Sequence, residues 1–347
     1  GYVGIASVEG ELPVEFSLQT GLRCFSRKYD IPYMRHGSEN IFHTVGFISG
    51  ALNEEQHVGI ALGMDNLIYD AEQADYTLLQ LNPYYTLEND NIRLRVGAHV
   101  DWQSANGSGI KAAPDVKLDY TFADTYVAYL HATGGTRLND FRQQNEESPY
   151  WGVINQMRTS YTPADLQVGF KASPLPGLGF HLFGGYRVTK DEIFHLPGIT
   201  DTDFPYCYSL LMQEKAKVGY GGIKAAYGYK DIFDFSVGGT YYGWNVKDEA
   251  KVLLYLKPEF VLDASARAKV YDEFWISAAY RYEGRVKAGE LEKADAINNL
   301  SLSAGYEFFN SLNVFVRFNN LLNQDYITEA GYPVQGFNAM AGVSFRF

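Results

Sequence analysis

Residues 92–103 read IRLRVGAHVDWQ, a stretch in which apolar and polar side chains alternate. The apolar set is Ile92, Leu94, Val96, Ala98, Val100 and Trp102, and the other set includes Arg93, Arg95, His99, Asp101 and Gln103. A period of two places the two sets on opposite faces of a β-strand. The stretch therefore predicts a strand with one apolar and one charged face.

The same alternation returns along the rest of the chain. Apolar sets with this spacing run through 262–270, 274–282, 300–308, 312–318 and 337–347. Continued to Gly1, the pattern gives roughly 16 to 17 segments of about ten or more residues, the length of a tilted membrane strand. Because bacterial barrels use even strand numbers, we expect an all-β, antiparallel transmembrane β-barrel of about 16–18 strands. Residues 1–347 are expected to form this single barrel, and an odd count would indicate a missing N-terminal strand or segment.

The connections between these segments alternate in length. Short connections fall at 52–54, 87–90, 122–124, 173–177, 229–231, 271–273 and 309–311. Long connections fall at 27–39, 135–163, 190–213, 245–258, 286–295 and 323–334. Short periplasmic turns and long extracellular loops are the layout of outer-membrane barrels.

Composition narrows the function classes. The chain has 27 Tyr, 22 Phe and 34 Gly, which suits many strands with aromatic faces and tight turns. A formal net charge of −12 argues against a nucleic acid as partner. Cys24 and Cys207 lie far apart and without metal-ligand spacing, so we expect no metal site and no cofactor, while one disulfide stays open. No signal peptide is visible at Gly1, which predicts a mature or truncated form.

A soluble antiparallel sandwich would also alternate, with one face buried. Two features favour the membrane barrel instead. Many of the segments exceed the five or six residues usual in soluble sheets. Aromatic side chains such as Phe274, Tyr282, Phe308 and Trp102 also lie near strand ends, as in the aromatic girdles of membrane barrels.

The C-terminal part of the chain carries a family resemblance. The stretch NNLLNQDY at 319–326 is followed by GYPVQG at 331–336 and by a last strand ending in Phe347. With these motifs, the last hundred or so residues resemble the C-terminal strands of TonB-dependent receptors. The resemblance implies an outer-membrane location, surrounding outer-membrane lipid, and recognition of Phe347 by the barrel assembly machinery.

Two stretches in the middle of the chain extend this resemblance. Residues 113–117 and 134–141 look like TonB-dependent-receptor-like outer-membrane proteins of the Bacteroidota, so that most of the chain is covered. A plug domain and a TonB box, which the full receptors carry, are not recognisable. Energy-coupled import by this chain alone is therefore not implied.

The polar faces of the strands define a candidate lumen lining. Its members are Arg93, Arg95, His99, Asp101, Lys117, Lys171, Arg187, Lys224, Arg267, Arg281, Glu283 and Arg317. These residues either line a solute path and set its charge selectivity or pair with one another and hold the wall. For any single residue the sequence favours the second interpretation.

The loop at 135–163 holds the candidate extracellular binding residues. These are Arg137, Asn139, Asp140, Arg142, Tyr150 and Trp151. Such a mixture either binds a sugar or peptide or packs over the lumen, and the sequence leaves both open. The acidic residues of 190–213 lack the spacing of a calcium loop, which favours a solvated loop.

Catalytic signals are weak. His99 and Asp101 are two residues apart, while His57, His131 and His181 have no nucleophile beside them by spacing. We therefore expect no enzyme. The leading hypothesis is a receptor-like transport protein that takes up or binds an extracellular nutrient, with or without a surface lipoprotein. The alternatives are a plug-less diffusion channel and a non-conducting structural or partner-binding barrel.

Overall fold

The structure, a computed structural model, describes residues 1–8, 14–28, 37–70, 73–153, 156–199, 207–308, 311–329 and 331–345. The long strands are β2 (Val14–Ser26), β3 (Ser38–Ala51), β4 (Gln56–Tyr69), β5 (Tyr76–Glu88), β6 (Ile92–Gln103), β7 (Gly109–Phe122), β8 (Tyr126–Arg137), β10 (Ser160–Leu175), β11 (Leu178–Ile199), β12 (Cys207–Tyr229), β13 (Phe233–Asn245), β14 (Pro258–Lys269), β15 (Phe274–Arg285), β16 (Ile297–Phe308), β17 (Leu312–Asn319) and β20 (Asn338–Phe345). The shorter elements are β1 (Tyr2–Ala6), β9 (Trp151–Val153), β18 (Ile327–Glu329), β19 (Tyr332–Pro333), the helix α1 (Phe141–Glu147) and the 3₁₀ helix η1 (Asp248–Leu254).

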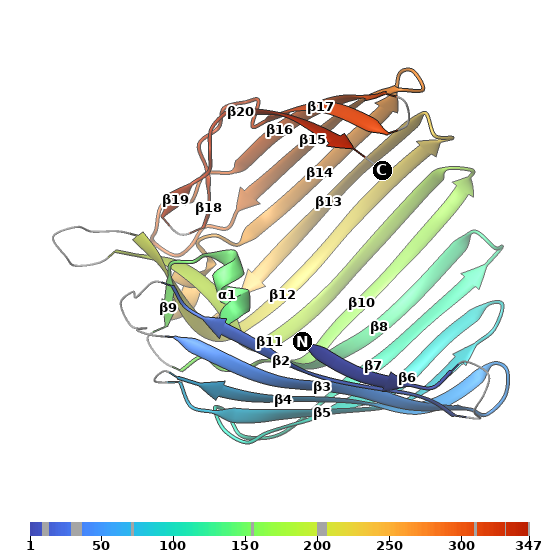
Figure 1. The fold of residues 1–347 in the computed structure, drawn as a ribbon, viewed down its shortest axis with the longest axis vertical. Helices are drawn as coiled ribbons and strands as arrows, with labels where there is room; N and C mark the ends of the chain where they lie inside the picture. Colours follow the sequence, from blue (N-terminus) through green and yellow to red (C-terminus); the bar gives the residue numbers. More distant parts are fainter. Residues whose placement is uncertain are drawn as a thin grey trace.

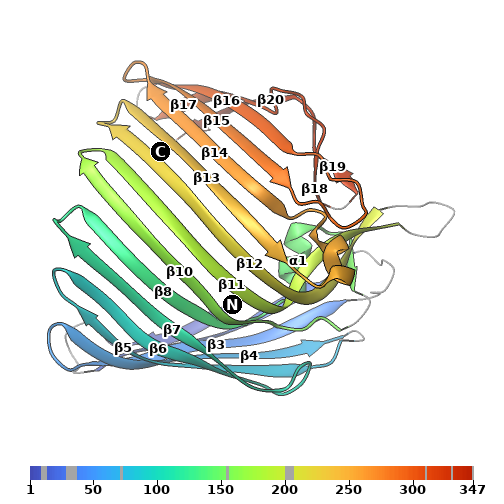
Figure 2. The same ribbon diagram turned by 180° about the vertical axis from the view of Figure 1, so that it is seen from behind.

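The strands form one curved wall (Figure 1 and, from behind, Figure 2). Consecutive long strands pair antiparallel in an 18-stranded sheet, and only the short β9 pairs in parallel, with β12. The predicted all-β antiparallel barrel architecture is thus confirmed, with a strand number in the expected range. Among the described residues no pairing joins β1 to β20, so these two strands are the edges of a sheet that is not closed.

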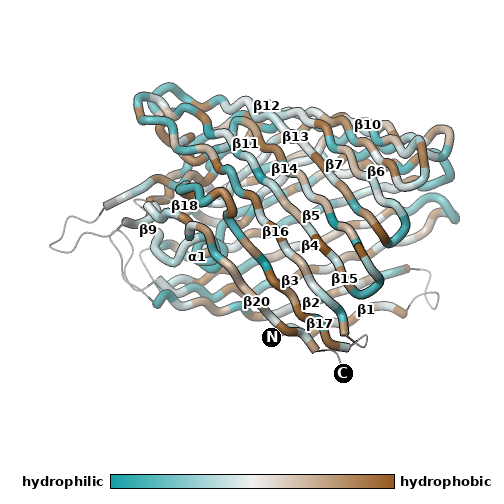
Figure 3. Tube along the Cα trace, turned by 90° about the horizontal axis from the view of Figure 1, so that it is seen from above, coloured by the Kyte–Doolittle hydropathy of each residue, from teal (hydrophilic) through white to brown (hydrophobic). Residues whose placement is uncertain are grey.

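The two faces of the wall differ as the alternation predicts, and Figure 3 shows hydropathy changing along the strands. On β10, Leu166 and Val168 are 51% and 54% exposed on the outer face. On the inner face polar side chains meet across the curvature: Asn82 of β5 donates to Asp115 of β7 at 3.1 Å, across the intervening β6. A large exposed apolar surface is costly in water and favourable in lipid.

One predicted loop is wrong. The structure continues β11 to Ile199 and begins β12 at Cys207, so most of 190–213 is strand. A bulge between Thr189 and Glu192 shifts the register, and beyond it Phe194 and Leu211 are buried. Apolar side chains that pack at the end of the wall outweigh the local acidic composition. Asp201 and Asp203, two of the acidic residues of this segment, lie outside the described residues.

The long segment 135–163 contains structure of its own. It holds α1 and β9, and its last residues already belong to β10. Phe141 and Trp151 are fully buried in a cluster with Ile41, Leu67 and Tyr69, which lie on β3 and β4. The segment therefore packs on the wall at its loop end, which favours the packed interpretation of this loop.

Two more of the long connections also contain short elements. The connection 245–258 holds η1, and 323–334 holds β18 and β19, which pair with each other in a separate sheet. Leu253 and Leu254 of η1 are buried against Phe194 and Ala216, so η1 too is fixed to the extended part of β11 and β12. Elsewhere on the wall, Cys24 is a free and exposed thiol.

Candidate functional site

The structure places the predicted lumen residues on the inner face of the wall. Several of them are tied into ion pairs. Arg95 Nε donates to Asp115 at 2.6 Å, and its Nη2 donates to Asn82 at 2.7 Å. The guanidinium also lies 3.9 Å from the ring centre of Tyr84. Because Asp115 is 5% exposed, this network holds a buried carboxylate in place rather than offering it to a solute.

A second network contains Arg281 and Glu283. Arg281 donates to Asp263 at 2.9 Å and to Glu283 at 2.7 Å, and Glu283 also accepts from Arg285 at 2.6 Å. The sequence analysis did not single out Arg285. Its buried guanidinium donates further to the carbonyls of Leu256 and Ile327 at 2.6 and 2.8 Å. Arg285 thereby joins the wall to two connections at the loop end.

Other predicted lumen cations lie beside rings. Lys171, Lys224 and Arg267 lie 5.5, 5.5 and 4.5 Å from the rings of Tyr129, Phe183 and Trp275. Lys171 and Lys224 flank His181 in the register of β10, β11 and β12, which makes a basic row on the inner face.

The rest of the predicted lumen set is distributed over the wall. Arg93 pairs with Glu88 at 2.7 Å near the turn side, and His99 lies 3.2 Å from Asn82. Asp101 accepts from the Thr136 N–H at 2.7 Å, next to Gly135, whose φ of +120° favours glycine. In the register Lys117 faces Arg95 and His131, Arg187 faces Asp165 and Val218, and Arg317 faces Ser303 and Met340.

The six predicted loop residues do not form one site. Asn139 is buried and donates to the Arg158 carbonyl at 2.7 Å, and Asp140 caps α1 by accepting from the Gln143 N–H at 2.6 Å. Trp151 is fully buried, and the Arg27 guanidinium donates to its carbonyl. Arg142 pairs with Glu146 at 3.0 Å, Arg137 lies 3.9 Å from Glu192, and Tyr150 stacks on Tyr332. Most of these side chains hold the loop in place, and their predicted role in binding stays untested.

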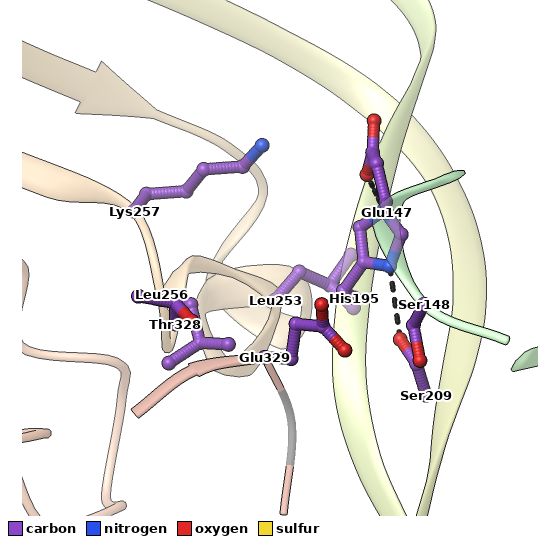
Figure 4. A pocket seen from close by; sticks show the side chains of 9 residues that line it. All are labelled: Glu147, Ser148, His195, Ser209, Leu253, Leu256, Lys257, Thr328 and Glu329. Carbon is purple, nitrogen blue, oxygen red and sulfur yellow. Dashed lines mark hydrogen bonds and ion pairs between the residues drawn. The ribbon is translucent and has the colours of Figure 1, made fainter. Parts of the chain in front are cut away.

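A cavity of about 320 Å³ lies at the loop end of the wall (Figure 4). We call it the mouth pocket. Its lining comes from the end of α1 (Glu147, Ser148), from the extended strands (His195, Ser209), from η1 and the residues after it (Leu253, Leu256, Lys257), and from β18 (Thr328, Glu329). Five separate segments thus meet around one space, and two of them are held by Arg285.

His195 is held from both sides. Its Nε2 lies 2.9 Å from Glu147 Oε2, and its Nδ1 lies 2.9 Å from Ser209 Oγ. The hydrogen bond with His195 is the main cause that holds the pKa of Glu147 below its usual value. These contacts tie α1 to β11 and β12.

Ser209, His195 and Glu147 are arranged like a nucleophile, its base and an acidic partner. Their positions in the sequence do not reveal this arrangement. However, Ser209 is 1% exposed. Its N–H, the donor that an oxyanion would need, already donates to the Tyr150 carbonyl at 2.6 Å. The three residues therefore support a structural tie, and the expectation of no enzyme stays a prediction.

Lys257 and Glu329 are the remaining charged groups of the mouth pocket. Figure 4 shows Lys257 reaching in from one side, opposite Glu147 and His195, with Glu329 between them in the view. The Lys257 ammonium lies 5.0 and 5.4 Å from the rings of Phe194 and Trp244. Burial lowers the pKa of Lys257, because the ammonium has lost much of its water.

Sequence reasoning missed Glu147, His195, Lys257 and Glu329. They come from α1, β11, the end of the η1 connection and β18, and none is part of a local motif. Alternation along the strands could not find them, since the connections that bring them together fold by contacts between segments far apart in sequence.

The part of the chain that the structure describes shows neither a metal site nor a membrane-spanning helix. No group of three or more His, Cys, Asp or Glu side chains is placed to hold a metal ion. None of the described helices is long and apolar enough to cross a membrane.

No known family profile matches the chain, and no curated protein matches its sequence. Solved structures do match in fold. The copper transporter OprC is 12% identical with a TM-score of 0.68, covering 100% of this chain and 67% of its own. P. aeruginosa FpvA bound to pyoverdines is 14% identical with a TM-score of 0.69, covering 99% and 55%. The iron transporter FrpB from Neisseria meningitidis is 12% identical with a TM-score of 0.72, covering 100% and 62%.

These matches establish an outer-membrane β-barrel fold. The chain spans 55 to 67% of the length of these three neighbours. At such identities the likeness extends to the fold, and what each neighbour transports is a property of that protein.

Proposed function

We propose that this chain is the barrel of a Gram-negative outer-membrane receptor that takes up or binds a small extracellular solute. The observation that carries the proposal is the mouth pocket, a cavity of about 320 Å³ at the loop end. Ligand pockets are concave, with few polar groups that converge on the ligand. The mouth pocket has this character, at the end of the wall where long connections gather.

The neighbours support the transport class. Their names describe a copper transporter, an iron transporter and a pyoverdine outer-membrane receptor. The motifs at 319–326 and 331–336 support the TonB-dependent-receptor-like class, and those at 113–117 and 134–141 the Bacteroidota type. Outer-membrane lipid, a surface lipoprotein and the assembly machinery remain proposed partners, and Phe347 lies outside the described residues.

Current recordings in planar lipid bilayers distinguish the receptor from its two alternatives, a diffusion channel and a structural or partner-binding barrel. Purified protein acting as a receptor is expected to give no steady openings. Large, stable openings would overturn the proposal in favour of a plug-less diffusion channel. A silent barrel that also binds no solute would favour a structural or partner-binding barrel.

Filling the mouth pocket tests whether it receives the solute. We expect cells that carry the wild-type protein to deplete at least one small solute from a defined mixture faster than cells without it. Thr328→Trp, which places a bulky side chain at the pocket lining, should abolish the difference. The matched control is Leu291→Trp, at a residue that is 41% exposed and outside the pocket lining. Equal depletion by both variants would contradict the proposal.

A further inference from the structure

The charged groups of the mouth pocket fall into two kinds. Glu147 is engaged by His195 at 2.9 Å, and the other imidazole nitrogen is engaged by Ser209. Lys257 and Glu329 differ, because among the described residues neither has an oppositely charged side chain within 4.0 Å. One cation and one anion in the same lining are therefore left for a ligand.

Lys257 is poised to receive an anion. Its one hydrogen bond among the described residues is a long one, to the Ile193 carbonyl at 3.5 Å. The rings of Phe194 and Trp244 lie beside its ammonium. The carboxylates of Glu192 and Glu147 favour its charge without contacting it within 4.0 Å. A ligand carboxylate in direct contact would add a charge-assisted hydrogen bond.

Glu329 supplies the opposite charge. It lies on β18, and the carbonyl of Ile327, the first residue of this strand, accepts a hydrogen bond from Arg285 at 2.8 Å. Arg285 also holds the carbonyl of Leu256, next to Lys257. A single buried guanidinium thus fixes the backbone beside both charged residues, which preorganises the pair for binding.

The combination discriminates between ligand classes. A purely anionic ligand would meet Glu329 and Glu147, and a purely cationic ligand would meet Lys257, so each would be repelled by part of the lining. A ligand with both charges satisfies both groups. The volume of about 320 Å³ lies near the lower end of the usual range of roughly 300–1,000 Å³ for ligand pockets.

We infer that the mouth pocket binds a small zwitterion of amino-acid or dipeptide size, with its carboxylate on Lys257 and its ammonium on Glu329. This inference rests on the proposed receptor function and names the solute class of the same site. Leu253 and Leu256 supply the apolar part of the lining, against which the body of such a ligand would lie.

The test compares three ligands: alanyl-alanine, its C-terminal amide and its N-acetyl derivative. We expect isothermal titration of the purified full chain in detergent to show binding of the zwitterion. Each blocked derivative should bind at least about tenfold more weakly, the effect of one charge-assisted hydrogen bond.

Two variants test which residue binds which charged end of the ligand. Lys257→Met, which keeps the packing on Phe194 and Trp244, should bring the zwitterion and its amide to equal affinity. Glu329→Gln should do the same for the zwitterion and its N-acetyl derivative. The controls are Lys251→Met and Glu290→Gln, at exposed residues outside the pocket lining, which should keep the wild-type preference. If Lys257 and Glu329 only stabilised the pocket, their variants would lower the affinities for all three ligands together.

The outcomes separate the inference from the function on which it rests. No binding of alanyl-alanine, or equal binding of all three ligands, overturns the inference that the pocket binds a zwitterion. If Thr328→Trp still abolishes solute depletion by cells, the proposed receptor function is kept and the ligand belongs to another class. If no solute is depleted by the wild type either, the proposed function fails as well.

Discussion

At the scale of single residues, the inner face holds its charges in specific pairs. Arg95 contributes hydrogen bonds to two residues and a ring contact, and Asp115 depends on it for charge compensation. Removal of one partner of a buried ion pair leaves an uncompensated charge, which costs far more than the loss of an exposed pair. Burial, more than the distance between the charges, decides which pairs stabilise the barrel.

Arg95→Met should therefore destabilise the folded barrel by about 3 kcal/mol. The control, Arg93→Met, lies two residues away on the same strand and breaks a pair with side chains that are 73% and 65% exposed. Its cost should be below about 1 kcal/mol. Urea unfolding in lipid vesicles, followed by tryptophan fluorescence, measures both. Equal losses would show that the Arg95 network does not stabilise the wall.

At the scale of the elements, α1 depends on its contacts. A helix of seven residues is unstable alone in water, even with the Asp140 cap. The fully buried Phe141 fixes it, with its ring 4.8 Å from that of Tyr69 and 5.3 Å from that of Trp151. The backbone N–H of Phe141 also donates to the buried Glu39 at 3.0 Å. Tertiary packing thus brings Glu147, at the end of α1, to the mouth pocket.

Phe141→Ala should weaken the docking of α1 by about 3–5 kcal/mol, the usual cost of such a truncation. The segment 138–153 would then lose protection against hydrogen exchange, which mass spectrometry of its peptides detects. The neighbouring Arg142→Ala removes an exposed side chain and should leave the protection unchanged. Unaltered exchange in Phe141→Ala would mean that other contacts hold the segment.

At the scale of the whole molecule, the two faces of the wall meet different surroundings. Two adjacent residues in the middle of β10 illustrate the two faces. Leu166 is 51% exposed on the outer face, and Gln167 faces His131 and Gly185 in the register of the inner face. An added charge that faces lipid is costly, whereas an added charge on a polar inner face is tolerated.

Leu166→Arg should destabilise the membrane-inserted barrel by about 2–4 kcal/mol, whereas Gln167→Arg should be tolerated. Folding into lipid vesicles, scored by the shift of the folded band on unheated gels, compares the two variants. A larger loss for Gln167→Arg would reverse the assignment of the faces, and with it the membrane barrel.

Much of the wall was predictable because each strand is a local pattern. The alternation in 92–103 predicted both the strand β6 and the inward direction of Arg95 and Asp101. The same argument failed at 190–213, where acidic residues suggested a loop. There the strand pairing of β11 with β12 and the burial of Phe194 decide the structure, and both involve distant partners.

The sequence by itself determined the class of fold and the two faces, since a period of two dictates which side chains share a face whatever their partners are. Only the tertiary structure decided where the long connections go and which of their side chains meet. Glu147, His195, Lys257 and Glu329 come together because Phe141, η1 and Arg285 fix their segments by contacts between distant parts of the chain. Such contacts leave no periodic trace in the sequence, so the mouth pocket became visible only in the folded molecule.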